Sequence, residues 1–355
     1  MLAGIIAANN IRYSPYIFFY TDILKRHDIR YELIIADRYG LDEDFDAPVM
    51  KLPWNPQRHV IANCLEYSRG VKKILRKKKY DLLIVLTSSN AVFLSPWLKR
   101  HYEKRYIVDI RDYSHENIPL YFSLEKAAVM HSLLNVVSSG KFTSFLPEAD
   151  YHVCHNYEER TGETFSFRKG EDPVRIGYVG GLSYVEQNEK LMRMVRDDPR
   201  FTLDYYGTST KEQLLREAAK PYENERIRFH GGYAPAEKEE ILWKVDILFN
   251  AYGNHSPLLD YALSNKLYDA LIHRKPILTC PDTYMTEMAG PLAFAIDLDD
   301  GNALNDLYEW YQAIDGETVE AYASAKMDAI REENRETREK IDTSIRKLKE
   351  TASAR

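Results

Sequence analysis

The strongest constraint on this chain is a repeated alternation of short apolar runs with stretches of helical spacing, which starts at the N-terminus and starts again near residue 174. Short apolar runs bounded by polar residues predict buried strands, and helices between consecutive strands make those strands parallel. The sequence therefore predicts an α/β fold with two doubly wound domains. The expected strands are Leu2–Ala8, Tyr31–Ala36, Leu82–Leu86, Tyr106–Ile110 and Leu133–Val137 in the first series, and Arg175–Val179, Phe201–Tyr206, Ile227–Phe229, Asp246–Asn250, Pro276–Thr279 and Ala293–Ile296 in the second.

A polar, charged stretch between Asn156 and Pro173 separates the two series, and we place the domain boundary there. A chain of 355 residues is long enough for two hydrophobic cores. We expect a Rossmann-like N-terminal domain that binds the acceptor over residues 1–165, a Rossmann-like C-terminal domain over 172–316, and a helical segment over 317–355 that packs along the outside. The carboxyl ends of both sheets would face a cleft, where open α/β sheets bind ligands.

Composition limits the classes of function. A formal net charge of -6 argues against nucleic-acid binding, because that function usually needs a basic surface. The three cysteines lie far apart without a C-x-x-C pair, which indicates reduced thiols and a cytoplasmic protein. The chain has no H-E-x-x-H motif and no compact His/Cys cluster, so we expect no metal site. Two D-x-D matches within Asp42–Asp46 fall in a polar loop, and we discount them as a metal site.

The second series opens with a strand that ends in Gly180 and Gly181, directly ahead of a helix. Paired glycines let backbone N–H groups approach an anion at a helix N-terminus, which suits a diphosphate. The alternative is a tight turn that needs glycine only for its backbone geometry. Gly207 ends the next strand at the same edge, and Tyr233 follows the third strand, where its ring could flank a nucleotide base.

A second cluster of polar residues opens the helix near residue 265. Ser264 is a suitable N-cap, Asn265 and Lys266 lie in the first turn, and Asp269 follows one turn later. N–H donors, an amide and an ammonium then lie at one anion-binding helix end. A carboxylate at position 269 can accept two hydrogen bonds from the vicinal hydroxyls of a ribose. The alternative is a structural helix in which Asp269 pairs with Lys266 or His273.

Taken in order, these segments resemble the donor half of retaining glycosyltransferases of family four, which have the GT-B fold. The resemblance covers residues 175–297 and, more loosely, the first half. It implies that Gly180 and Gly181 approach the donor diphosphate, that Asn265 and Lys266 contact phosphate or sugar, and that Asp269 holds the ribose. The motifs that carry it are Tyr178-Val179-Gly180, Tyr206-Gly207, Phe229-His230-Gly231, Asn265–Asp269 and Lys275-Pro276-Ile277.

In the first half, the run Asp109-Ile110-Arg111-Asp112 follows an expected strand. It resembles the Asp-x-Arg-Asp turn of bacterial family-four enzymes that build surface polysaccharides. The resemblance implies catalytic roles for Arg111 and Asp112, which would lie under the reacting sugar or orient the acceptor. A surface ion pair at a strand end is the alternative. Asn9 and Asn10 follow the first strand, in the loop where relatives carry glycines that approach the donor.

One dense basic run lies on a helix whose other side is predicted to be apolar. In an acidic protein such a local patch could hold the N-terminal domain to anionic lipids at the inner face of the cell membrane, and the alternative is an ordinary solvated helix face. The basic residues are Arg69, Lys72, Lys73, Arg76, Lys77, Lys78 and Lys79, and the apolar stripe is Val60, Ile61, Cys64, Leu65, Val71, Ile74 and Leu75.

The resemblance implies a hexosyltransferase, and the lack of a metal-binding motif predicts that the reaction is metal-independent. The enzyme would move a sugar, with retention, from a UDP-linked donor to a saccharide or lipid-linked saccharide acceptor, as in capsule or other surface polysaccharide biosynthesis. The nucleotide-sugar is a substrate, and no cofactor is expected. Two alternatives stay open. A non-hydrolysing nucleotide-sugar 2-epimerase has the same fold, and Tyr261 stands where the family commonly carries a first glutamate upstream of Asp269, which leaves room for a non-catalytic partner protein.

Overall fold

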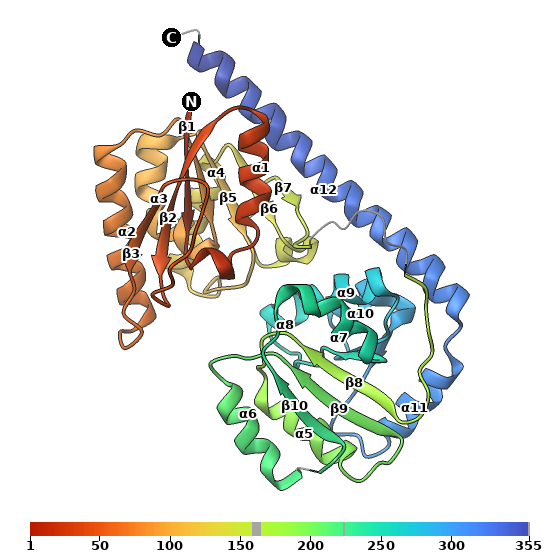
Figure 1. Cartoon of the computed structure of the whole chain (residues 1–355). Coiled ribbons are helices and arrows are strands. Elements are labelled where there is room, and N and C mark those ends of the chain that lie inside the picture. Colours follow the sequence, from red (N-terminus) through yellow and green to blue (C-terminus); the bar gives the residue numbers. More distant parts are fainter. Residues whose placement is uncertain (158–164, 223, 354–355) are drawn as a thin grey trace. The chain divides into compact units, whose positions relative to one another are not determined.

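The computed structural model describes residues 1–157, 165–222 and 224–353. The chain divides into two compact units, which we call unit 1 (Met1–Asn156 with Arg331–Arg355) and unit 2 (Tyr157–Ile330). Each unit contains one parallel sheet flanked by helices (Figure 1). The charged run Glu158–Glu163, part of the stretch in which the sequence places the domain boundary, lies outside the described residues.

Unit 1 is built on a seven-stranded sheet in the order β3-β2-β1-β4-β5-β6-β7, in which neighbouring strands are parallel. All residues of β4, β5 and β6 are buried, as expected for parallel strands covered on both faces. The expected strands do not include β3 or β7. Both lie at an edge of the sheet and are only partly buried, and Lys51 interrupts the apolar run of β3. The strands are β1 Leu2–Ala7, β2 Arg30–Asp37, β3 Val49–Pro53, β4 Leu82–Leu86, β5 Tyr106–Ile110, β6 Leu134–Val137 and β7 Tyr151–Val153.

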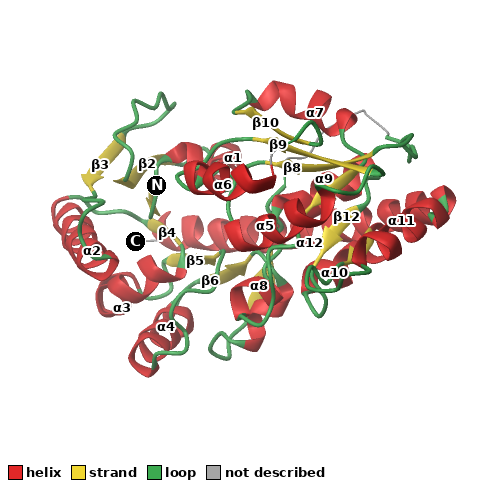
Figure 2. Cartoon of the chain, turned by 90° about the horizontal axis from the view of Figure 1, so that it is seen from below, coloured by secondary structure: helices red, strands yellow, loops and turns green. Residues whose placement is uncertain are grey.

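Helix α1 (Ile17–Arg26) shares its core with the end of the long helix α12 (Gly316–Ser353). Ile341 and Ile345 of α12 are fully buried in this core, and the Thr337 hydroxyl donates a hydrogen bond to the Val153 carbonyl at 2.5 Å. The last helix therefore contributes core residues to unit 1, although the sequence indicates only an outer segment over 317–355. The remaining helices, α2 Val60–Lys77, α3 Ser88–Tyr102 and α4 Pro119–His131, lie next to one another (Figure 2).

Helix α2 departs from the apolar stripe predicted for it. Val71 and Leu75 are buried as expected, but Val60, Ile61 and Leu65 are 56%, 46% and 41% exposed. The buried side of the first turns is occupied by a polar residue, Asn63. Its amide nitrogen donates to the Asn55 carbonyl at 2.8 Å, and its amide oxygen accepts from the Asn55 N–H at 3.1 Å. Because Asn63 turns inward to hold the loop before the helix, the three aliphatic side chains turn outward.

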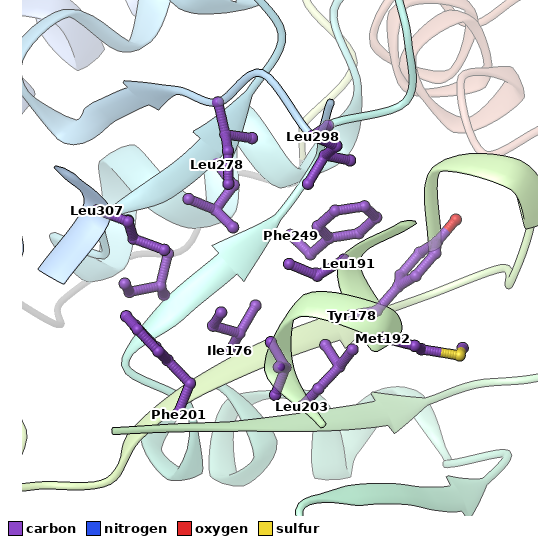
Figure 3. Close-up of a cluster of buried hydrophobic side chains, with 14 of the residues drawn as sticks. Ile176, Tyr178, Leu191, Met192, Phe201, Leu203, Phe249, Leu278, Leu298 and Leu307 are labelled. Atoms are coloured by element: carbon purple, nitrogen blue, oxygen red, sulfur yellow. The ribbon is translucent and has the colours of Figure 1, made fainter. Parts of the chain in front are cut away.

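Unit 2 is built on a six-stranded parallel sheet in the order β10-β9-β8-β11-β12-β13. Its largest core cluster packs strand residues such as Ile176, Phe201 and Leu203 against helix residues such as Leu191 and Leu307 (Figure 3). The strands are β8 Val174–Val179, β9 Phe201–Tyr206, β10 Ile227–Gly231, β11 Ile247–Phe249, β12 Ile277–Thr279 and β13 Ala293–Ala295. The helices are α5 Val185–Val195, α6 Glu212–Ala219, α7 Lys238–Lys244, α8 Pro257–Tyr261, α9 Asn265–His273, α10 Tyr284–Ala289 and α11 Ala303–Ala313, followed by the first part of α12.

Among the described residues, no helix is both long and apolar enough to cross a bilayer.

Candidate functional site

The candidate site lies at the carboxyl edge of the unit 2 sheet, beside β8. Strand β8 is flanked by β9 on one side and β11 on the other, so the order of the strands reverses here. Open parallel sheets bind ligands outside the carboxyl ends of the strands at such a switch point. The segments that follow β8 and β11 are therefore the ones to compare with the predicted site.

Glycines end three neighbouring strands, and they have different tasks. Gly180, Gly207 and Gly231 have φ values of +130°, +132° and +80°, a region that favours glycine. A Cβ on Gly207 would lie 1.8 Å from the Gly180 carbonyl oxygen, so this position requires glycine for packing. The Gly180 N–H donates to the Tyr206 carbonyl at 2.9 Å, and this hydrogen bond removes it from the amides that could meet a diphosphate. Gly181 has open space on its Cβ side, which leaves its backbone accessible to a ligand.

Helix α9 is fixed to the end of β11 through its N-cap. The Ser264 hydroxyl accepts a hydrogen bond from the Lys266 N–H at 3.3 Å and donates to the Asn250 side-chain oxygen at 2.6 Å. The predicted Ser264 cap is confirmed. Asn250 directly follows β11, so the cap places the first turn of α9, with Asn265 and Lys266, at the carboxyl edge of the sheet. The positive end of the helix dipole lies in the same place.

Lys266 is the most unusual side chain of the site. It is 8% exposed, and its ammonium lies 4.7 Å from the centre of the Tyr178 ring and 5.3 Å from that of Tyr252. Burial lowers the pKa of this ammonium to about 7, while the charge of Asp269 opposes the shift and that of Lys238 adds to it. Its nitrogen would lie 3.4 Å from a Cβ on Gly180, which places the cation beside the glycine turn. A buried amine in this state gains stability when an anion arrives.

The aromatic rings around Lys266 escaped the sequence prediction. Tyr184 stacks on Tyr252 with ring centres 4.1 Å apart and an angle of 11° between the planes. Tyr184 also has a φ of +59°, a strained conformation for a residue other than glycine. The sequence places each tyrosine near the predicted site, because Tyr184 follows the glycine pair and Tyr252 follows β11. It does not indicate that the two rings stack, because the residues are far apart in the chain.

Asp269 has a different partner from either of those predicted. Its Oδ1 accepts a hydrogen bond from the Lys238 ammonium at 2.7 Å, and the two side chains are 14% and 25% exposed. Lys238 opens α7, 31 residues earlier in the chain, so helical spacing could not reveal this pair. Tyr233 lies close enough to Asp269 to be affected by its charge. Burial, and then the charge of Asp269, raise the pKa of Tyr233 to about 12.

In unit 1, Arg111 is an internal residue and not part of a surface ion pair. Its guanidinium meets the fully buried Asp109 carboxylate through Nε at 2.6 Å and Nη2 at 2.7 Å, and Nη1 donates to the Cys154 carbonyl at 2.9 Å. The guanidinium also lies 5.0 Å from the centre of the Tyr16 ring. Asp112, the next residue, is exposed. Arg111 therefore joins the ends of β5 and β7, and Asp112 is the member of the predicted pair that solvent can reach.

Asn10 holds two loops of unit 1 together. It is fully buried, and its amide nitrogen donates to Asp37 at 2.8 Å while its amide oxygen accepts from the Arg38 N–H at 2.9 Å. The side-chain oxygen of Asn9 accepts from the Asn10 N–H at 2.9 Å. Asn10 thus acts within the loop, and the expectation that it meets a ligand directly has no support in this geometry.

A buried polar cluster at the start of α3 was also missed. The Ser88 hydroxyl lies 2.7 Å from that of Tyr121, 2.5 Å from Glu125 and 3.2 Å from Glu116. Burial raises the pKa of Glu125 to about 8. The hydrogen bond from Ser88 lowers this pKa, and the charge of Glu116 raises it. Its members come from segments that are distant in the chain, so no motif marks it. Within residues 1–157, 165–222 and 224–353, no group of three or more His, Cys, Asp or Glu is arranged to hold a metal ion.

Comparison with known proteins gives structural matches only. No protein-family model matches the chain, and neither does any curated protein sequence. Among solved structures, sucrose-phosphate synthase from Thermosynechococcus elongatus superposes with a TM-score of 0.70 at 11% identity, covering 100% of this chain and 99% of that one. Anabaena HepE in complex with UDP gives a TM-score of 0.67 at 15% identity, covering 97% and 100%. A UDP-N-acetylglucosamine 2-epimerase gives 0.58 at 13% identity, covering 91% and 90%.

These matches extend over nearly the whole chain and include both sheets. The chain therefore has the GT-B fold, with two Rossmann-like α/β domains and a long C-terminal helix. The predicted fold class is confirmed.

Proposed function

We propose that this protein is a glycosyltransferase that binds a nucleotide-sugar donor at the carboxyl edge of the unit 2 sheet. The observation that carries the proposal is Lys266, a buried ammonium between Tyr178 and Tyr252, beside the Gly180–Gly181 turn and at the N-terminus of α9. Burial destabilises the charged form of Lys266 in the empty protein, which lowers its pKa to about 7, and a bound diphosphate would stabilise that charged form.

The same residues suit the chemistry of sugar transfer. Negative charge accumulates on the leaving diphosphate as the bond to the anomeric carbon breaks. The Lys266 ammonium, the Gly181 N–H and the first turn of α9 would stabilise that charge from fixed positions, which is why we propose a metal-independent reaction. The aromatic rings keep water from the ammonium, and this strengthens its attraction to phosphate.

We assign the nucleoside to Asp269 and its neighbours. Lys238 holds Oδ1 of Asp269. The second carboxylate oxygen would accept the hydrogen bonds from ribose hydroxyls. Tyr233 would flank the base. UDP is the proposed nucleotide, because solved structures of HepE with this fold are described as complexes with UDP and with UDP-glucose.

For the acceptor we propose a saccharide or lipid-linked saccharide, bound by unit 1 at the carboxyl edge of its sheet. Asp112 is exposed there and would orient the acceptor, while Arg111 is a positioning residue that holds the ends of β5 and β7. Retention of configuration, transfer of a hexose, a role in capsule or other surface polysaccharide biosynthesis, and action at the inner face of the cell membrane complete the proposal. They rest on the resemblance to family-four enzymes.

Titration of UDP by calorimetry tests the donor site. We expect the wild-type protein to bind UDP and Asp269→Asn to bind it roughly tenfold or more weakly, because a charge-assisted hydrogen bond contributes about 1.5–3 kcal/mol. Asp197→Asn is the matched control, since Asp197 is exposed and pairs with its neighbour Arg196. Thermal unfolding of each variant checks that the fold is intact. Absence of stabilisation by either UDP or GDP at millimolar concentration would instead favour a non-catalytic protein.

One observation favours a second function of the same site, because 2-epimerases are among the structural matches. Incubation with UDP-N-acetylglucosamine and no acceptor separates the two activities. A transferase leaves the donor unchanged or slowly hydrolyses it, whereas an epimerase converts it to the 2-epimer, which chromatography of the sugar detects.

A further inference from the structure

The solvent-facing side of α2 carries aliphatic side chains in addition to those that the helix buries against the rest of unit 1. Asn63, Tyr67, Val71 and Leu75 already give the helix a buried side. Val60, Ile61 and Leu65 nevertheless lie exposed in its first two turns. Adjacent large aliphatic side chains at a protein surface mark a site of interaction.

The second half of the same side is basic. Arg69, Lys73 and Lys77 are exposed and follow Ile61 and Leu65 at four-residue spacing, so each side chain neighbours the next along the helix. We call Val60, Ile61, Leu65, Arg69, Lys73 and Lys77 the α2 surface.

The contacts of the other basic residues show which charges are available. Lys72 donates to the Phe93 carbonyl at 3.0 Å, Arg76 lies 4.8 Å from the centre of the Trp97 ring, and Lys78 pairs with Glu32. Within the described parts of the chain, Arg69, Lys73 and Lys77 form no ion pair. The nearby acidic residue, Glu66, is paired with Arg58.

We infer that the α2 surface binds an anionic lipid bilayer. The aliphatic residues would enter the boundary between headgroups and acyl chains, and the three free cations would contact the headgroups. The charge of the whole protein, -6, opposes general attraction to polyanions, so binding depends on this local pairing of apolar and basic residues. A nucleic-acid backbone would use the cations but leave the aliphatic residues exposed.

The position of the surface gives the inference a functional consequence. Helix α2 follows the carboxyl end of β3, so its first turns lie toward the edge of the sheet at which we place the acceptor. Contact with a membrane there would bring a lipid-linked acceptor to unit 1. Membrane binding itself does not require the proposed glycosyl transfer, and the donor site can be tested apart from it by UDP titration.

Sedimentation of the full chain with vesicles tests the inference. We expect binding to phosphatidylcholine vesicles that contain phosphatidylglycerol, and little binding to phosphatidylcholine alone. The triple variant Arg69→Gln, Lys73→Gln, Lys77→Gln should bind the anionic vesicles roughly 100-fold more weakly, since each basic residue near the surface contributes about fivefold. The control Lys99→Gln, Arg100→Gln, Lys126→Gln changes the net charge equally at exposed positions of α3 and α4 and should bind like the wild type.

A second variant separates the bilayer from other anionic partners. Ile61→Ser with Leu65→Ser keeps the charge and should weaken vesicle binding while it leaves UDP binding unchanged. The inference is overturned if the wild type ignores anionic vesicles, if the control triple variant loses as much binding as the test variant, or if the serine variant binds vesicles normally. Binding of single-stranded RNA that competes fully with vesicles and ignores the serine substitutions would also overturn it, in favour of a nucleic-acid surface.

Discussion

The low pKa of Lys266 leads to a sharp prediction about how donor binding depends on pH. In the empty protein the ammonium is buried and its pKa is about 7, from an ordinary value of 10.5. A diphosphate beside it favours the charged form and raises this pKa on binding. Binding therefore takes up a proton, so affinity is full below pH 7 and falls as the pH rises through that value.

The magnitude follows from the fraction of the protein that is charged before binding. About nine tenths of Lys266 is protonated at pH 6, half at pH 7 and roughly 3% at pH 8.5. If the bound amine stays protonated throughout, the affinity for UDP-glucose falls roughly 30-fold between pH 6 and pH 8.5. UDP-glucose is the suitable probe because its diphosphate, esterified at both ends, does not titrate in this range.

Calorimetry in two buffers of different ionisation enthalpy measures both effects at once. We expect uptake of about 0.9 proton per site at pH 8 and about 0.1 at pH 6. Lys266→Met should abolish the uptake and flatten the pH dependence, while the exposed-site control Lys244→Met should behave like the wild type. Affinity that stays constant from pH 6 to 8.5 with no proton uptake would refute the assignment of Lys266 to the diphosphate.

Three further predictions concern the framework around the two sites. Gly207→Ala should lower the free energy of unfolding in urea by about 3 kcal/mol or more, because the new Cβ would collide with the Gly180 carbonyl. Gly231→Ala, where a Cβ meets open space, should lower it by only about 1 kcal/mol. Equal losses in the two variants would contradict the packing argument. The pKa of Glu125 is raised from 4.5 to about 8 on folding, so this carboxyl makes the folded protein less stable as the pH rises between those values. Relative to the wild type, Glu125→Gln should therefore be about 2 to 3 kcal/mol more favourable for folding at pH 7 than at pH 5. An effect of the substitution that does not change with pH would show that Glu125 is ionised normally. Arg111→Met should lower the free energy of unfolding by about 3–5 kcal/mol, because it leaves the buried Asp109 charge unpaired. A loss below about 1 kcal/mol would instead support the alternative in which Arg111 forms only a surface ion pair.

The sequence by itself determined the fold and the local geometry of the site. Strands and helices follow from apolar spacing within each segment, and all eleven expected strands are present, although the edge strands β3 and β7 were not among them. The Ser264 cap depends only on the residues next to it, and the glycine turns follow directly from strands that the pattern identifies. The common feature is that these properties are decided by contacts between residues close in the chain.

The tertiary structure alone decided which side chains meet. Tyr178 reaches Lys266 across 88 positions of sequence, and Asp269 pairs with Lys238 on another helix rather than with its own neighbours. Burial set the charge states, because the same lysine in solvent would have an ordinary pKa. The outward turn of Ile61 on α2 likewise depended on the inward turn of Asn63 toward a loop. Periodicity records that a helix has an apolar side, but packing against the rest of the unit decides which residues that side buries.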